Sequence, residues 1–241
     1  MARVSRREAV REATRRDILD AARKLLASGG PSSVTLRAVA GEIGMTAPGL
    51  YRYFPSHEAL LLGLTDAVVG ELADAIEATA AAHEDDPAAA LLESARAFRA
   101  WCLDHKREFQ LAFGLEPAPP GTAPAPHCDN ENVRRMCRFF FMLFVRLHAE
   151  RGFAVPPPEA LHPELCRQLH AWHDQLGGDV PADVPLGLVK VFAEAWVRLY
   201  GIVAMEVFGH LRFLLTDVDA LFETMLAEYG ELLVAPGDRG R

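Results

Sequence analysis

Four side chains in the second half of the chain have the types and spacing of metal ligands. Cys166, His170 and His173 lie at i, i+4 and i+7, and His162 precedes Cys166 by one helical turn. At 100° per residue, all four fall within an arc of about 80° on one helix. Thiolate and imidazole groups are common ligands of zinc and other transition metals. The spacing therefore keeps a metal site open as one interpretation.

Other features of the same segment argue against a metal. These side chains border an apolar stripe of leucines and a tryptophan, where a histidine is commonly half-buried without binding a ligand. His162 would lie about 16 Å from His173 along the helix axis, and the sequence offers no fourth ligand with supporting spacing. We therefore expect no metal and no other cofactor, and we retain Cys166, His170 and His173 as the candidate ligands of the metal alternative.

The sequence carries no complete catalytic motif. Glu159 and His162 form one Glu-x-x-His pair, but a di-iron bundle needs two such pairs on separate helices. The prolines on both sides of this pair also interrupt a helix at that point. Nucleophile-elbow, P-loop and dinucleotide fingerprints are missing from the sequence. We expect the protein not to be an enzyme.

Charge is distributed unevenly along the chain. Residues 1–60 hold ten basic and six acidic side chains, a net charge of +4, whereas the remainder has a net charge of −12. A basic region in an acidic protein attracts polyanions, which makes nucleic acid the first partner to consider; a merely solvated arm is the other interpretation. Six of the basic residues are arginines within the first sixteen positions: Arg3, Arg6, Arg7, Arg11, Arg15 and Arg16.

Length and composition fit a small domain joined to a larger one. The chain has 241 residues, half of them apolar, which is enough to bury a substantial core. The longest apolar run, Phe139–Val145, is far short of the roughly 18 residues that a membrane-spanning helix needs. The basic N-terminus is not followed by the apolar segment of a secretory signal, and the four cysteines lack CxxC spacing. We expect a protein of the cytoplasm, associated with the nucleoid.

The apolar periodicity predicts an all-α fold. The stripe from Ile18 to Leu26 predicts an amphipathic first helix that stops at Gly29-Gly30-Pro31. Two short helices follow, Leu36–Ile43 and Ala47–Tyr53, and a long connector helix extends from His57 to about residue 82. Five prolines predict an exposed loop at 116–128. Further helices are expected at about 86–105, 130–152, 162–176, 186–212 and 217–233.

The two short helices have the spacing of a helix-turn-helix. If Leu36 is the first of twenty positions, Ala40 falls at position five, Gly44 at nine and Leu50 at fifteen. A small residue is needed where the helices cross, glycine where the turn has positive φ, and leucine where the second helix packs on the first. A short exposed second helix can enter the major groove of DNA. An ordinary helical hairpin is the alternative.

From about Thr14 to Leu64 the chain resembles the N-terminal domain of the TetR/AcrR family of one-component repressors. The resemblance implies a helix-turn-helix domain at residues 1–60 and a helical-bundle domain for ligand binding and dimerisation at 61–241. It also implies a homodimer that leaves a palindromic DNA operator when a small-molecule effector binds. The matching stretches are Ile18-Leu19-Asp20-Ala21-Ala22, Thr35-Leu36-Arg37-Ala38-Val39-Ala40, Gly44-Met45-Thr46-Ala47-Pro48-Gly49-Leu50-Tyr51-Arg52-Tyr53-Phe54-Pro55-Ser56 and Glu58-Ala59-Leu60-Leu61.

The resemblance also implies which residues contact DNA. Thr46 and Tyr51 are expected to bond phosphates, whereas Arg52 is suited equally to a guanine or to a phosphate. His57 departs from the family pattern, which usually has lysine there, so we expect a phosphate contact that depends on pH. Tyr53 and Phe54 are expected in the core. The expected DNA-binding set is Thr35, Arg37, Thr46, Ala47, Pro48, Gly49, Tyr51, Arg52 and His57.

The second domain has the material for an apolar effector cavity. Trp196 to Gly201 resembles the Trp-x-x-x-His-Gly signature of one TetR C-terminal subfamily, with Tyr200 in place of histidine. The last two helices are expected to form the dimer interface. Two alternatives to a ligand-released repressor stay open: a metal-sensing repressor, and a helical binding protein without an operator. The expected cavity residues are Trp101, Phe113, Phe140, Phe144, Trp172, Trp196 and Tyr200.

Overall fold

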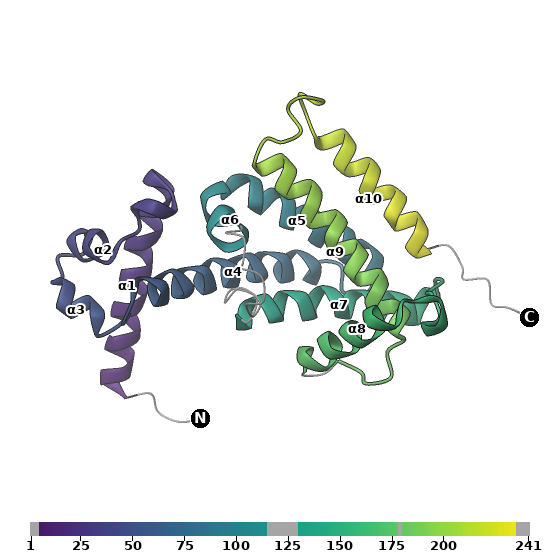
Figure 1. Ribbon diagram of the computed structural model, residues 1–241, viewed down its shortest axis with the longest axis horizontal. Coiled ribbons are helices and arrows are strands. Elements are labelled where there is room, and N and C mark those ends of the chain that lie inside the picture. Colours follow the sequence, from purple (N-terminus) through teal and green to yellow (C-terminus); the bar gives the residue numbers. More distant parts are fainter. Residues whose placement is uncertain (1–4, 115–129, 178–179, 235–241) are drawn as a thin grey trace, which may run out of the picture. The chain divides into compact units, whose positions relative to one another are not determined.

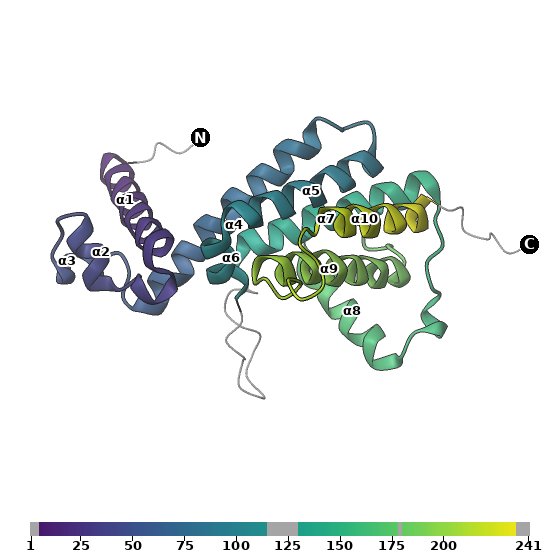
Figure 2. The same cartoon turned by 90° about the horizontal axis from the view of Figure 1, so that it is seen from above.

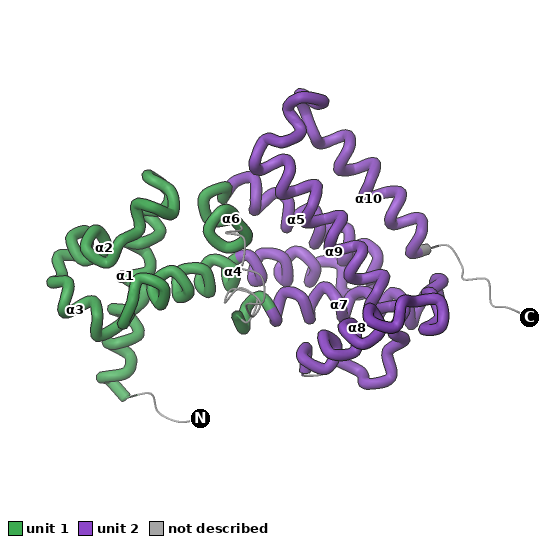
Figure 3. Tube along the Cα trace, viewed as in Figure 1, with its two compact units in different colours: residues 1–71, 105–133 green, residues 72–104, 134–241 purple. Residues whose placement is uncertain are grey.

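The computed structural model describes residues 5–114, 130–177 and 180–234, and these form helices and turns without a strand (Figure 1). The predicted all-α fold is confirmed. The chain divides into two compact units, one from 1–71 and 105–133 and the other from 72–104 and 134–241 (Figure 3). The loop expected at 116–128 lies entirely outside the described residues. No described helix is long and apolar enough to cross a membrane.

The first unit is built on three helices at the N-terminus. Helix α1 spans Arg6–Gly29, α2 spans Leu36–Glu42 and α3 spans Ala47–Tyr51, with the start of α4, His57–Ala81, closing the unit. Ile18, Val39, Leu50 and Leu60 are completely buried between them. Helix α3, the second helix of the motif, ends at Tyr51 and is shorter than the expected Ala47–Tyr53.

Helix α1 begins well before the apolar stripe that predicts it. Ser5 and Glu8 form a capping box, in which the Ser5 hydroxyl accepts from the Glu8 amide and the Glu8 carboxylate accepts from the Ser5 amide. Residues 5–13 are all exposed, so this cap rather than packing favours helix at the N-terminus. Arg6, Arg7 and Arg11 thus lie on a helix.

Helix α6, Lys106–Phe113, belongs to the first unit, whereas the sequence-based boundary at residue 60 assigns it to the second domain. Its Glu108 is nearly buried and accepts a hydrogen bond from Arg23 of α1 at 3.2 Å. Arg23 also pairs with Glu71 of α4. Phe109 is fully buried beside this ion pair. Contacts between residues so distant in the sequence leave no local periodic signal, so the expected boundary missed them.

The second unit contains α5, α8, α9, α10, nearly all of α7 and the end of α4. Figures 1 and 2 show α9 and α10 side by side and running in opposite directions. Phe98, Phe141 and Val203 are completely buried in this unit. The bounds are Pro87–Asp104 for α5, Glu131–Arg151 for α7, Pro163–Leu176 for α8, Leu186–Val207 for α9 and Asp219–Val234 for α10.

Helix α9 ends five residues before the expected residue 212. Gly209 has φ 71°, a left-handed conformation that glycine adopts at little cost and that stops the helix. Helix α10 then starts two residues after the expected residue 217. The Asp217 side chain accepts from the Asp219 amide at 2.9 Å near its beginning.

Arg99 joins three helices of the second unit. Its guanidinium donates two hydrogen bonds of 2.7 Å to Glu206 of α9, and it also pairs with Asp219 at the start of α10. Its carbon Cζ lies 4.6 Å from the centre of the Phe222 ring. Only 11% of the Arg99 side chain and 14% of the Glu206 side chain are exposed, so water screens this pair weakly.

We predict that Arg99→Met lowers the free energy of unfolding of this unit by about 2 to 3 kcal/mol, because it leaves the Glu206 carboxylate buried without its cation. Denaturant titration followed by circular dichroism measures the effect. The matched control is Arg167→Met, because Arg167 forms a solvent-exposed pair with Glu164, and such pairs contribute little to stability. Equal losses in the two variants would contradict the role given to Arg99.

Candidate DNA-binding surface and effector cavity

Threonine residues cap both helices of the helix-turn-helix. The Thr35 hydroxyl oxygen accepts from the Ala38 amide at 3.1 Å, and the Thr46 oxygen accepts from the Gly49 amide at 3.3 Å. Both threonines are exposed. Because each hydroxyl uses only its oxygen in the cap, its proton stays available to donate to a phosphate.

The turn between the helices has the geometry that the spacing predicts. Gly44 has φ 67°, which an L side chain rarely adopts. The Met45 amide donates to the Ala40 carbonyl at 2.8 Å and closes the turn. Ala40 is almost fully buried, and Leu50 is completely buried on the inner side of α3. These contacts leave the opposite side of α3 facing outward.

The outward side of α3 carries side chains without protein partners. Half of the Tyr51 surface is exposed, and Pro48 and Arg52 are exposed too. Within the described part of the chain, the side chains of Tyr51, Arg52 and Arg37 form no hydrogen bond or ion pair. Ala47 and Gly49 are partly exposed beside them. The members of the expected DNA-contacting set that lie on and beside α3 are therefore accessible.

Phe54 links the motif to helix α1. It is buried, as expected, whereas Tyr53 is only half-buried. The Arg15 guanidinium carbon lies 4.3 Å from the centre of the Phe54 ring, a cation–π contact. A Cβ on Gly63 would come within 2.7 Å of the same ring. Glycine at 63 therefore gives Phe54 and Arg15 room to pack.

The His57 ring contacts the backbone just before α2. Its Nε2 lies 2.5 Å from the Val34 carbonyl oxygen. A carbonyl oxygen can only accept a hydrogen bond, so Nε2 carries the proton. The other ring nitrogen, Nδ1, carries no proton in the neutral ring. Protonation of Nδ1 creates a charged donor on an exposed residue. The phosphate contact expected for His57 stays a prediction, now limited to Nδ1.

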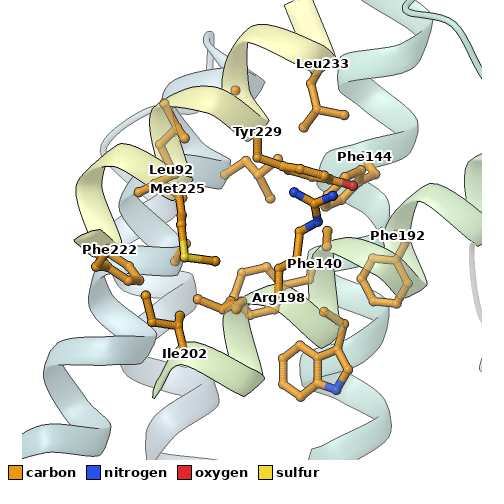
Figure 4. Close-up of a pocket in the computed structure, with 17 residues that line it drawn as sticks. Leu92, Phe140, Phe144, Phe192, Arg198, Ile202, Phe222, Met225, Tyr229 and Leu233 are labelled. Carbon is orange, nitrogen blue, oxygen red and sulfur yellow. The ribbon is translucent and has the colours of Figure 1, made fainter. Parts of the chain in front are cut away.

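A cavity lies within the second unit, between α5, α7, α9 and α10. It encloses about 690 Å³, including the part open to solvent, and its wall is almost entirely apolar. Phe140, Phe144 and Trp196 line it, as expected from the sequence. Figure 4 shows aromatic side chains of α7 and α9 on one side and Phe222, Met225 and other α10 residues around the rest.

The other expected cavity residues do not line this cavity. Phe113 belongs to the first unit, where its ring lies 5.2 Å from that of Phe109. Trp172 stacks on Phe192 at 5.2 Å on the α8 side of α9. Tyr200 stacks on Trp196, and Trp101 is buried on α5. Clustering of aromatic residues in the sequence indicated the core but not which face of each helix meets the cavity.

Two polar residues of the cavity wall were missed by the sequence analysis. The Tyr229 hydroxyl donates to the Val191 carbonyl at 2.8 Å, and burial raises the pKa of Tyr229 to about 12, so it stays protonated at neutral pH. The Arg198 guanidinium carbon lies 5.2 Å from the centre of the Tyr229 ring. The sequence signal that could have found Arg198 is its position as a single arginine within the otherwise apolar stretch from Trp196 to Met205.

The four side chains with metal-ligand spacing bind backbone groups instead. His170 Nδ1 lies 2.9 Å from the Cys166 carbonyl, and His173 Nε2 lies 3.1 Å from the Pro181 carbonyl. His162 Nδ1 accepts from the Glu164 amide at 3.2 Å. Among the described residues, no group of three or more His, Cys, Asp or Glu is placed to hold a metal ion. The geometry does not support the metal alternative.

An N-terminal helix-turn-helix and a separate helical unit with an apolar cavity define a class of transcriptional regulators. The family model described as bacterial regulatory proteins, tetR family, matches residues 18–64. The model described as the C-terminal domain of tetracyclin repressor-like proteins matches residues 91–229, more than half of the chain. The chain belongs to the TetR family of transcriptional regulators. Regulators of this family bind operator DNA, dimerise and bind small-molecule effectors.

Individual proteins show the same likeness over nearly the whole chain. HTH-type transcriptional regulators Rv1816 of Mycobacterium tuberculosis and Mb1846 of Mycobacterium bovis are each 28% identical over 234 residues, which is 92% of this chain and of each relative. The crystal structure of a protein described as regulatory, SCO4313, is 26% identical with a TM-score of 0.69, covering 93% of this chain and 98% of that one. A Rhodococcus sp. RHA1 protein of unknown function shares the fold at 19% identity, TM-score 0.64, over 90% and 93% of the two chains.

We predict that the affinity for operator DNA rises as the pH falls from about 8 to 6, because a protonated His57 presents a cation and a second N–H donor. Fluorescence anisotropy of a labelled operator at fixed salt measures this dependence. His57→Lys should remove most of it, because lysine stays charged throughout this range. An equally steep dependence in His57→Lys would show that another group is responsible.

Proposed function

We propose that the protein is a repressor that binds a palindromic operator as a homodimer and leaves it when a small molecule enters the cavity of the second unit. The observation that carries this proposal is the outward side of α3, where Tyr51 and Arg52 are exposed and form no hydrogen bond or ion pair with any described residue. A helix of this kind fits the major groove, whose width admits one α-helix. The proposed role implies a location in the cytoplasm, on the nucleoid.

Within this proposal, the residues of the motif divide into two roles. Thr35 and Arg37 at the start of α2, with Thr46 and Tyr51, hold phosphates and set the position of the helix. Arg52 contacts either a guanine edge or a phosphate, and the small surface of Ala47, Pro48 and Gly49 lets the backbone approach the bases.

Helix α1 extends the proposed DNA surface. Arg7, Arg11 and Arg15 follow one another at four-residue intervals and so share one face of the helix. Arg15 is held beside the motif by its contact with Phe54. We assign to these arginines contacts with phosphates next to the half-site, which strengthen binding without selecting a sequence.

Operator binding is tested with fragments that the protein enriches from genomic DNA, identified by sequencing. We predict that Tyr51→Ala and Arg52→Ala each weaken binding to such a fragment by roughly 1 to 3 kcal/mol if the lost contact is to a base edge. A lost phosphate contact would instead reduce the salt dependence. Arg167→Ala on α8 is the control. If both α3 variants bind like wild type at the same salt concentration, α3 does not contact the operator.

An exposed stripe on α9 supports a dimer through the last two helices. Val197 is 68% exposed and Met205 is 42% exposed, and Gly201 lies between them at the same helical spacing. A Cβ on Gly201 would meet no atom within 4 Å. Val189, Phe192 and Val203, three apolar residues of this helix, instead face the core of their own chain and are buried. We assign the exposed stripe to the contact with a second copy, where glycine permits close approach.

We predict that Gly201→Leu weakens the dimer at least tenfold, because the new side chain occupies space that the partner helix needs. The substitution is not expected to destabilise the single chain, since glycine lowers helix stability by about 1 kcal/mol relative to better helix formers. Sedimentation equilibrium measures the dimer dissociation constant, and circular dichroism checks folding. Ala171→Leu, on an exposed face of α8, is the matched control. An unchanged dissociation constant in Gly201→Leu would contradict this interface.

A further inference from the structure

The cavity of the second unit has one charged side chain in its wall. It is partly open to solvent, and its wall is almost entirely apolar, as in most small-molecule sites. Among the described residues that line it, Arg198 is the one that carries a charge. The Tyr229 hydroxyl and the Trp196 indole are neutral. An apolar cavity with a single cation discriminates strongly between ligands of different charge.

Arg198 has no carboxylate partner in the described part of the chain. Glu194, one turn earlier on α9, pairs with Lys190 at 2.7 Å instead. The Arg198 side chain is exposed at the edge of the cavity, and Figure 4 shows it extending towards the Tyr229 ring. The aromatic contact restrains the guanidinium, while its N–H groups stay available to bind an anion.

We propose that the cavity binds a molecule with a long apolar body and one carboxylate, and that Arg198 holds the carboxylate. The body would pack against Phe140, Phe144 and Ile202, which provide no partner for a polar group. The planar guanidinium suits a carboxylate because two parallel N–H···O bonds can form. A cationic ligand of the same length would be repelled by Arg198. This inference rests on the proposed role of the cavity as the effector site.

Binding of three probes with the same chain tests the ligand class. Dodecanoate and dodecylammonium, each below its micellar concentration, and dodecanol, below its solubility limit, are titrated into the full-length protein. The signal is the change in intrinsic tryptophan fluorescence, to which Trp196 in the cavity wall contributes together with Trp101 and Trp172, with calorimetry as an independent measurement. We predict that dodecanoate binds at least tenfold more tightly than either other probe, which corresponds to about 1.4 kcal/mol. Equal binding of dodecanol and dodecanoate would overturn the proposal.

Variants of Arg198 locate the carboxylate. Arg198→Met removes the charge but retains a long, unbranched side chain. It should weaken the binding of dodecanoate at least tenfold without changing the binding of dodecanol. Arg198→Lys should restore part of the loss, because it keeps the charge but not the planar fork. Arg167→Met is the control for loss of an exposed arginine elsewhere in the unit. Unchanged dodecanoate binding in Arg198→Met would overturn the assignment.

A second substitution tests whether the apolar body occupies the cavity. Ala195 lines the wall, so Ala195→Phe should fill part of the space and weaken both dodecanoate and dodecanol. Circular dichroism confirms that the variant is folded. If the folded variant binds both probes like wild type, the probes bind elsewhere and the proposal fails.

Operator release separates this inference from the proposed function. Dodecanoate is added to the complex of the protein with its operator fragment, and anisotropy reports the DNA that is released. Release that is lost in Arg198→Met supports both proposals. Arg198-dependent binding without release supports the ligand class and contradicts the effector role. Release by dodecanol at the same concentration as by dodecanoate supports an effector role but overturns the assignment of a carboxylate.

Discussion

The burial of Leu50 on the inner side of α3 is the interaction on which the proposed DNA-binding surface depends. Leu50 is completely inaccessible, and Ala40 at the crossing of α2 and α3 is small enough to let the helices approach. Gly44 adopts the positive φ that the intervening turn requires. With one side of α3 fixed in this way, Thr46, Tyr51 and Arg52 face outward without any need for their own packing. A short helix can therefore present a reading surface because its other side is buried.

In the second unit, helix α9 likewise presents sides with different roles. One side is buried in the core through Val189 and Val203, and another lines the cavity through Trp196, Arg198 and Ile202. A third side exposes the apolar stripe that we assign to the dimer. A ligand in the cavity would thus contact the same helix that meets the second copy. Arg99 connects this helix to α5 and α10 through its pairs with Glu206 and Asp219.

Local sequence patterns predicted the helices well and their partners poorly. The apolar stripe, the threonine caps and Gly44 act within a few residues, so the end of α1 and helices α2 to α4 could be predicted closely, whereas the exposed part of α1 before Ile18 left no apolar signal. The pairing of Arg23 with Glu108 spans 85 positions, so the inclusion of α6 in the first unit could not be foreseen. In the cavity, Phe140 and Trp196 were predicted by residue type. Arg198 and Tyr229 were missed because their contact joins two helices whose relative rotation the sequence does not specify.

We propose that α3 and the basic start of α1 together contact the operator. Hydrogen exchange of backbone amides, measured on the full chain with and without an operator fragment, tests this directly. Slower exchange on DNA binding is expected in residues 46–52 and in the first turns of α1, with α8 unchanged. Slower exchange in α8 together with unchanged exchange in residues 46–52 would contradict it.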